Sequence, residues 1–156
     1  MDAREQDRGQ DGEKNGEQDQ VRQAIELAVG ARADAYAPYS GFAMGAAVVG
    51  PGGRVARGVL VENVSLGLSM CAERVALFTA VAERLAPSVL AVCAPRTQGR
   101  LTFPCGACLQ VALEVAGGDL LVAAVDPDGV HEHAPLSSLL TRAPSRHSPI
   151  TTSWSA

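Results

Sequence analysis

The second half of the chain alternates between helical and short apolar segments, and this alternation restricts the fold more than any other feature. CAERVALFTAVAERL (71–85) places apolar side chains at helical spacing, and SVLAVCAP (88–95) reads as a strand buried on both faces. CGACLQVALEVA (105–116) predicts a second helix, and DLLVAAVDPDG (119–129) a second buried strand that ends in a turn. Because helices that alternate with buried strands pack on the faces of a central sheet, the sequence predicts an α/β fold.

The segments before residue 71 add a helix and a hairpin. Apolar residues recur at helical spacing from Gln20 to about Ala35, and YAPYSGF (36–42) predicts a loop because it contains proline and glycine. Two apolar runs flank GPGG within residues 43–63, which predicts a β-hairpin. Together the segments predict a mixed sheet of about five strands flanked by helices.

The two ends of the chain differ in composition from the rest. Residues 1–19 contain one alanine and one methionine as their only apolar side chains, so we expect a disordered N-terminal tail. Residues 144–156 are rich in serine and proline, and we expect a loose C-terminal tail. Residues 20–143 then form a single domain, as suits a chain of 156 residues.

Charge and hydropathy argue against two classes of partner. The formal net charge is −4 and the basic residues are scattered, so we expect no nucleic-acid partner. No run approaches the roughly 20 apolar residues that span a bilayer, and no apolar signal core opens the chain. We therefore expect a cytoplasmic protein without a membrane partner. The four cysteines are then metal ligands, catalysts or core residues rather than a disulfide framework.

Three of these cysteines fall where the predicted helices begin. Cys71 opens one helix, and Cys105 and Cys108 open the other, directly after Pro104. A helix N-terminus stabilises thiolates, and two helix starts at one edge of a sheet would bring the three sulfurs together. Catalytic zinc takes three protein ligands and keeps one position open, whereas structural zinc takes four. Three cysteines without an obvious fourth ligand predict the open kind.

Glu73 lies two residues after Cys71, in the first turn of the same helix. A carboxylate there could reach a water molecule held by the metal and pass its proton to a substrate nitrogen. The pattern C-A-E followed by P-C-x-x-C is the arrangement used by zinc-dependent nucleobase and nucleoside deaminases.

The segments APYSGFAMGAAVVGPGGRVARGVLVENVSLGLSMCAERVALFTAV and PCGACLQVALE resemble the cytidine deaminase family, in its small homo-tetrameric form with three cysteine ligands. The resemblance covers roughly residues 20–130. It implies a three-layer fold, one Zn²⁺ per subunit, and a homo-tetramer or homo-dimer that acts on a small-molecule nucleoside or amino-heterocycle. The residue roles that it implies are zinc ligands Cys71, Cys105 and Cys108, proton shuttle Glu73, substrate contacts Phe42, Glu62 and the Ala72 backbone amide, and Arg74 beside the ligand sulfurs.

The sequence departs from the family where the sugar is recognised. The family pattern N-x-E-N, whose first asparagine and glutamate hold the ribose hydroxyls, is LVEN here: Leu60 replaces the asparagine and Glu62 remains. Leu66 replaces an aromatic that helps to build the pocket across a subunit boundary, and the usual C-terminal LLP-x-x-F aromatic is absent. We therefore predict deamination of a cytosine-type nucleoside or a modified form of one; a blasticidin S-like aminoacyl nucleoside and a free amino-heterocycle are the alternatives.

Several other interpretations stay open from the sequence alone. The zinc site would be structural if Cys93 or a histidine (His131, His133 or His147) supplied a fourth ligand. The fold could also serve as a non-catalytic assembly module. Phe42 could be a core residue, Glu62 a solvated or arginine-paired carboxylate, and Arg74 part of a surface ion pair.

Overall fold

A five-stranded mixed sheet forms the middle layer of the molecule. The computed structural model describes the backbone of residues 3–144 and the side chains from residue 15 onward. The strand order is β2-β1-β3-β4-β5; β3 and β4 run parallel, and the other neighbouring pairs are antiparallel. The strands are β1 (Gly45–Val49), β2 (Val55–Val59), β3 (Val89–Cys93), β4 (Leu121–Val125) and β5 (His131–Pro135). The predicted mixed α/β sheet is confirmed.

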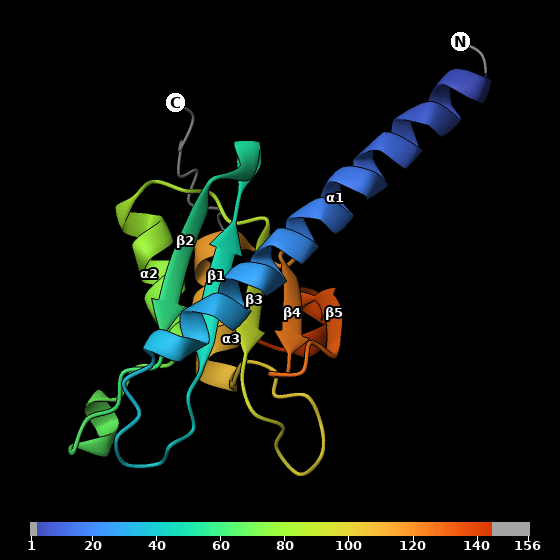
Figure 1. The fold of residues 1–156 in the computed structure, drawn as a ribbon. Coiled ribbons are helices and arrows are strands. Elements are labelled where there is room, and N and C mark those ends of the chain that lie inside the picture. Colours follow the sequence, from blue (N-terminus) through green and yellow to red (C-terminus); the bar gives the residue numbers. More distant parts are fainter. Residues whose placement is uncertain (1–2, 145–156) are drawn as a thin grey trace.

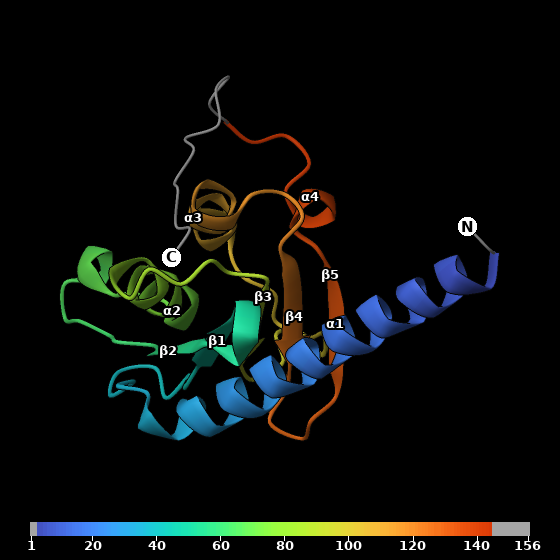
Figure 2. The ribbon, with the colours of Figure 1, turned by 90° about the horizontal axis from the view of Figure 1, so that it is seen from above.

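Helices cover both faces of the sheet (Figures 1 and 2). The helices are α1 (Ala3–Ala31), α2 (Ala72–Ala82), α3 (Gly106–Ala116) and the short α4 (Leu136–Leu139). In Figure 2 α1 lies along one face of the sheet, while α2 and α3 lie on the other. Val21, Ala24 and Ala28 of α1 are buried against β1, β3 and β4, which accounts for the apolar period in this part of the helix. The arrangement is the expected three-layer fold.

The parallel pair follows from the alternation read in the sequence. Both β3 and β4 are almost wholly buried, and the connection between them contains α3, because parallel neighbours need a crossover. The hairpin β1–β2 turns through a short 3₁₀ segment, Pro51–Gly53. The short helix α4 has no counterpart in the sequence-based prediction, since four residues carry too little periodicity.

The N-terminal segment differs from the prediction. Residues 3–19, expected to be disordered, continue α1 as regular helix, and this extension projects beyond the sheet in Figure 1. Once the packed part of α1 is formed, adding further turns requires no new nucleation, so a polar segment can extend a helix without an apolar face of its own. That a single domain spans residues 20–143 stays a prediction. We expected a loose C-terminal tail over residues 144–156, and residues 145–156 lie outside the described residues.

Candidate metal and catalytic site

The first turns of α2 and α3 meet on the same face of the sheet and bring three sulfurs together. Cys71 and Cys105 are the N-cap residues of α2 and α3, and Cys108 lies in the first turn of α3. The three Sγ atoms lie within 4.8 Å of one another. The convergence inferred from two helix starts is therefore present in the structure.

The charge state of the thiols suits a cation. A hydrogen bond from Cys108, followed by the hydrogen bond and charge of Arg74, lowers the pKa of Cys71 to about 5. The same bond to Cys71, together with burial, raises the pKa of Cys108. Cys71 thus ionises more readily than Cys108, and a divalent cation would favour the thiolate form of its ligands. Soft thiolates at this spacing fit zinc.

The cluster is open on one side. Cys108 is buried and Cys71 half-buried, but Cys105 is exposed, so a substrate or water molecule has access. Within residues 15–144 this is the one group of three or more possible ligand side chains close enough to share an ion.

The pleat of the sheet excludes three of the candidate fourth ligands, Cys93, His131 and His133, whereas His147 lies outside the described residues. Cys93 packs in the cluster beneath α1, on the face opposite α2 and α3. His131 and His133 are paired with Val125 and Ala123, which belong to that same face. None of the three side chains therefore points toward the sulfurs.

Glu73 is buried beside the sulfurs. Its side chain is 1% exposed, and within the described residues its Oε2 has no hydrogen-bond partner. Burial, with a smaller contribution from the Cys71 charge, raises the pKa of Glu73 to about 7, and a hydrogen bond with Cys108 opposes this rise. A carboxyl group in this range can both accept and donate a proton near neutral pH. A buried oxygen left unsatisfied in the protein also indicates a place for a ligand atom.

Arg74 points back to the cluster rather than to a surface carboxylate. Its Nη2 donates to Cys71 Sγ at 3.7 Å, and its buried Nε has no protein partner within the described part of the chain. A guanidinium here would offset part of the negative charge if the three thiols bound a metal ion as thiolates.

The close approach of β2 to the start of α2 depends on Gly58. A Cβ atom at this position would overlap the Ala72 carbonyl oxygen and the Ala76 backbone nitrogen. Ala72 itself is fully buried at the first helical position, immediately after Cys71. Glycine in β2 therefore sets how near Cys71 and the Ala72 amide lie to the sheet.

Glu62 and Phe42 are connected through a residue that the sequence did not single out, Ser40. The Glu62 carboxylate accepts hydrogen bonds from the Ser40 hydroxyl and from the Tyr39 backbone N–H, the latter at 2.8 Å. These two bonds lower the pKa of Glu62. Ser40 Oγ in turn accepts from the Phe42 N–H at 3.0 Å, and Phe42 packs half-buried against the core. A serine that accepts an N–H two residues on is a common turn device, which was the available local signal.

Leu60 lies two residues before Glu62 and points inward. It is 8% exposed and belongs to the core cluster on the α2 and α3 side of the sheet. The backbone of this segment is held on both sides: Tyr36 N–H donates to Leu60 O at 2.8 Å, and Val61 N–H donates to Met70 O at 3.0 Å. The substitution thus places an apolar side chain in a segment anchored next to Cys71.

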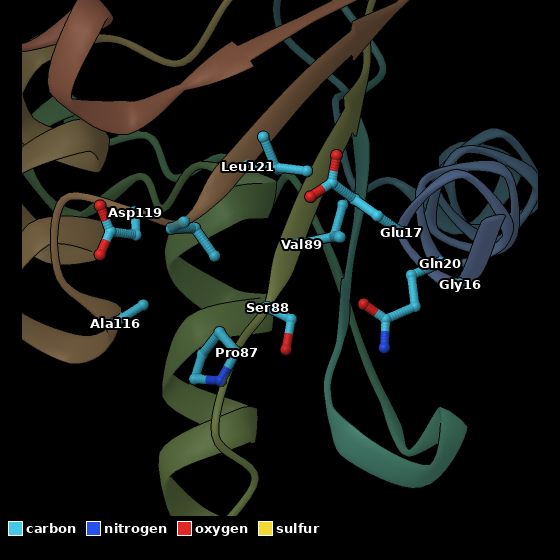
Figure 3. Close-up of a pocket in the computed structure, with 10 residues that line it drawn as sticks. Gly16, Glu17, Gln20, Pro87, Ser88, Val89, Ala116, Asp119 and Leu121 are labelled. Carbon is cyan, nitrogen blue, oxygen red and sulfur yellow. The ribbon is translucent and has the colours of Figure 1, made fainter. Parts of the chain in front are cut away.

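A separate hollow of about 520 Å³ lies at the opposite end of the sheet (Figure 3). Its polar lining residues are Glu17, Gln20, Ser88 and Asp119. It also includes Ala116, the last residue of α3, whereas Cys105 precedes the first, so about 16 Å of helix separates the two places. This hollow is not part of the cysteine site.

The fold and the site together define the class of zinc-dependent deaminases, and similarity to known proteins agrees. Residues 18–124 match the family described as cytidine and deoxycytidylate deaminase zinc-binding region. The cytidine deaminase of Halalkalibacterium halodurans is 41% identical over 119 residues, 76% of this chain and 89% of the relative.

Solved structures show the same similarity. The crystal structure of cytidine deaminase from Burkholderia pseudomallei has a TM-score of 0.72 and 42% identity, covering 78% of this chain and 97% of that one. Cytidine deaminase from Mycobacterium tuberculosis has a TM-score of 0.68 and 36% identity, covering 80% and 97%.

The chain belongs to the cytidine and deoxycytidylate deaminase family. It is a hydrolase of C–N bonds that carries out zinc-dependent, cytidine-type deamination. No helix among residues 3–144 has both the length and the apolar character to cross a membrane.

Proposed function

We propose that Cys71, Cys105 and Cys108 hold the zinc ion and that Glu73 moves the protons of the reaction. The observation that carries this proposal is a buried carboxylate with an unpartnered oxygen beside three convergent sulfurs. A bound zinc ion would supply an acidified water molecule as the nucleophile.

The remaining steps belong to Glu73. Its carboxylate takes a proton from the water nucleophile and delivers it to the ring nitrogen next to the amine-bearing carbon. A C–O bond forms at that carbon, and Glu73 then moves the second proton of the water, from the new hydroxyl group, to the amine. The C–N bond breaks as the C–O bond becomes a carbonyl, and ammonia leaves. Arg74 holds Cys71, and the Ala72 N–H binds the pyrimidine carbonyl.

For the substrate we propose a cytosine-type nucleoside with weakened recognition of the sugar hydroxyls. Phe42 packs against the base, and Glu62 offers the remaining carboxylate at the sugar end. Two observations support this reading: Leu60 offers no polar atom, and the Glu62 oxygens already accept hydrogen bonds from Ser40 and Tyr39. A site without a hydroxyl partner discriminates poorly against nucleosides that lack the hydroxyl.

We also propose a homo-tetramer or homo-dimer in the cytoplasm. The segment just before Cys71 exposes three large apolar side chains: Val64 at 79%, Leu66 at 84% and Leu68 at 68%. Contiguous exposed apolar side chains are typical of a contact surface, and a second copy of the chain would cover them beside the site.

The substrate is tested by the loss of the ultraviolet band of the amino-pyrimidine. Zinc-loaded protein is offered cytidine, deoxycytidine, cytosine and blasticidin S separately. We expect turnover of both nucleosides, whereas turnover of cytosine or blasticidin S alone would favour the corresponding alternative substrate. Zinc-bound protein that is inactive on all four would contradict the proposed function and favour the non-catalytic module.

The Glu73→Gln variant tests the proton shuttle. The amide has the same shape but cannot carry the proton, so we expect kcat/KM to fall by about 10²–10⁴-fold. Zinc content, measured by metal analysis, should stay at one ion per chain. Full activity in this variant would exclude Glu73 as the shuttle.

A further inference from the structure

The segment that joins β3 to Cys105, seen as the yellow loop in Figure 1, contains a small hydrogen-bonded hairpin. Thr97 and Arg100 exchange two backbone hydrogen bonds of 3.0 Å around Gln98 and Gly99, whose φ angles are 52° and 77°. Two positive φ angles in a two-residue turn are characteristic of tight hairpins. The Thr102 hydroxyl closes the hairpin at its base by donating to the Pro95 carbonyl oxygen at 2.6 Å.

Asp126 anchors this hairpin from the end of β4. Its side chain is 3% exposed, and Oδ1 accepts from the backbone N–H groups of Asp128 at 3.0 Å and Val130 at 2.9 Å. Oδ2 accepts from Arg96 Nε at 2.7 Å, and Arg96 Nη1 donates onward to the Gly99 carbonyl oxygen at 3.1 Å. One buried carboxylate thus joins the β4–β5 turn to the hairpin.

The pair differs from an ordinary surface ion pair. Arg96 is 41% exposed, and exposed pairs contribute little to stability. The carboxylate, however, is buried, so loss of Arg96 would leave Oδ2 without its partner inside the protein. The local structure would then have to move.

Such a movement would reach the sulfurs directly. Only Phe103 and Pro104 separate Thr102 from Cys105. Phe103 packs half-buried against the core, and Pro104 is buried with a fixed φ angle. The backbone between Thr102 and Cys105 therefore has little conformational freedom to absorb a movement of the hairpin. Cys71 is held independently, through α2 and the segment around Leu60.

We propose that Arg96 and Asp126 are positioning residues that set Cys105 and Cys108 against Cys71 and thereby slow the release of zinc. The inference rests on the proposed ligand set. It assigns a function in metal retention to two residues outside the proposed metal ligands and substrate contacts.

The test is the rate at which zinc-loaded protein loses zinc to an excess of a chromogenic chelator. We expect Arg96→Gln and Asp126→Asn each to release zinc about tenfold faster than the wild type, by analogy with residues that orient metal ligands. Because both variants break the same interaction, that between Arg96 and Asp126, the double variant should release zinc no faster than either single variant. Arg100→Gln removes a positive charge from the same hairpin and should leave the rate unchanged.

The Ile25→Ala variant separates a specific effect on zinc release from a general loss of stability. Ile25 belongs to α1 and packs against the core on the face of the sheet opposite α2 and α3, so this variant is destabilised far from the site. We expect an unchanged release rate in this variant. In cobalt-substituted protein, the visible absorption of thiolate ligation should shift in Arg96→Gln and stay the same in Ile25→Ala.

The outcomes distinguish failure of this inference from failure of the proposed ligand set. Wild-type protein that binds one zinc per chain, with wild-type release from Arg96→Gln and Asp126→Asn, would overturn this inference alone, as would equally fast release from Ile25→Ala. Wild-type protein that binds no zinc would overturn the proposed ligand set and this inference with it.

Discussion

At the scale of single residues, the proposed weak recognition of the sugar depends on Leu60. It stands where the family pattern has an asparagine, and its side chain is 8% exposed. For Leu60→Asn we expect kcat/KM for cytidine, relative to 2′,3′-dideoxycytidine, to rise about tenfold, because a buried amide would favour a substrate that brings a hydroxyl. In the free protein the amide lacks that partner, and we expect a loss of about 1–3 kcal/mol in the free energy of unfolding.

Leu60→Ala is the matched control for that prediction. It also removes the leucine side chain and destabilises the protein, but it supplies no polar atom. Steady-state kinetics on both nucleosides should give the wild-type ratio for this variant. An equal change in ratio for the alanine and asparagine variants would mean that space at this position, rather than hydrogen bonding, controls the choice.

At the scale of elements, the contact between β2 and α2 sets the position of Cys71. For Gly58→Ala we expect a loss of about 1–3 kcal/mol in the free energy of unfolding, because the added methyl group overlaps the backbone of α2. Since the first turn of α2 must shift, we also expect weaker zinc binding, measured by competition with a chelator.

Gly52→Ala provides the comparison. Gly52 lies in the β1–β2 turn with a φ angle of 68° and open space around its Cα, so alanine there strains the backbone without touching α2. This variant should lose stability, by about 1–2 kcal/mol, and keep the zinc affinity of the wild type. Equal losses of zinc affinity in both variants would contradict a specific effect of the β2–α2 contact.

Elements with their own periodicity could be predicted from the sequence. The buried strands are short continuous apolar runs, α2 and α3 carry apolar residues at helical spacing, and the meeting of three sulfurs followed from cysteines at two helix starts. Links between distant residues could not be predicted: Glu62 bonds Ser40 across 22 positions, and Arg96 bonds Asp126 across 30. The face on which Cys93 lies also required the register of the sheet, because a strand buried on both faces shows no alternation.

At the scale of the whole molecule, α1 combines a packed half with a projecting one. Among its described side chains, from residue 15 onward, Val21 is the first that is buried, at 6% exposure. Composition could not locate the start of this helix, because its first turns extend from packed turns rather than from an apolar face of their own. The domain boundary expected near residue 20 and the helix start at Ala3 therefore describe different properties: where packing begins and where helical backbone begins.

Removing residues 2–14 tests that distinction. We expect the free energy of unfolding to change by no more than about 0.5 kcal/mol and kcat/KM to stay within about twofold, because the packed turns of α1 remain. The helical circular-dichroism signal should fall in proportion to the turns removed. Val21→Ala, which truncates the first buried side chain instead, should lower the free energy of unfolding by about 1–3 kcal/mol with no loss of helical signal. Truncated protein that unfolds as readily as Val21→Ala would show that the projecting turns are held by contacts of their own, and would place the start of the folded unit well before residue 20.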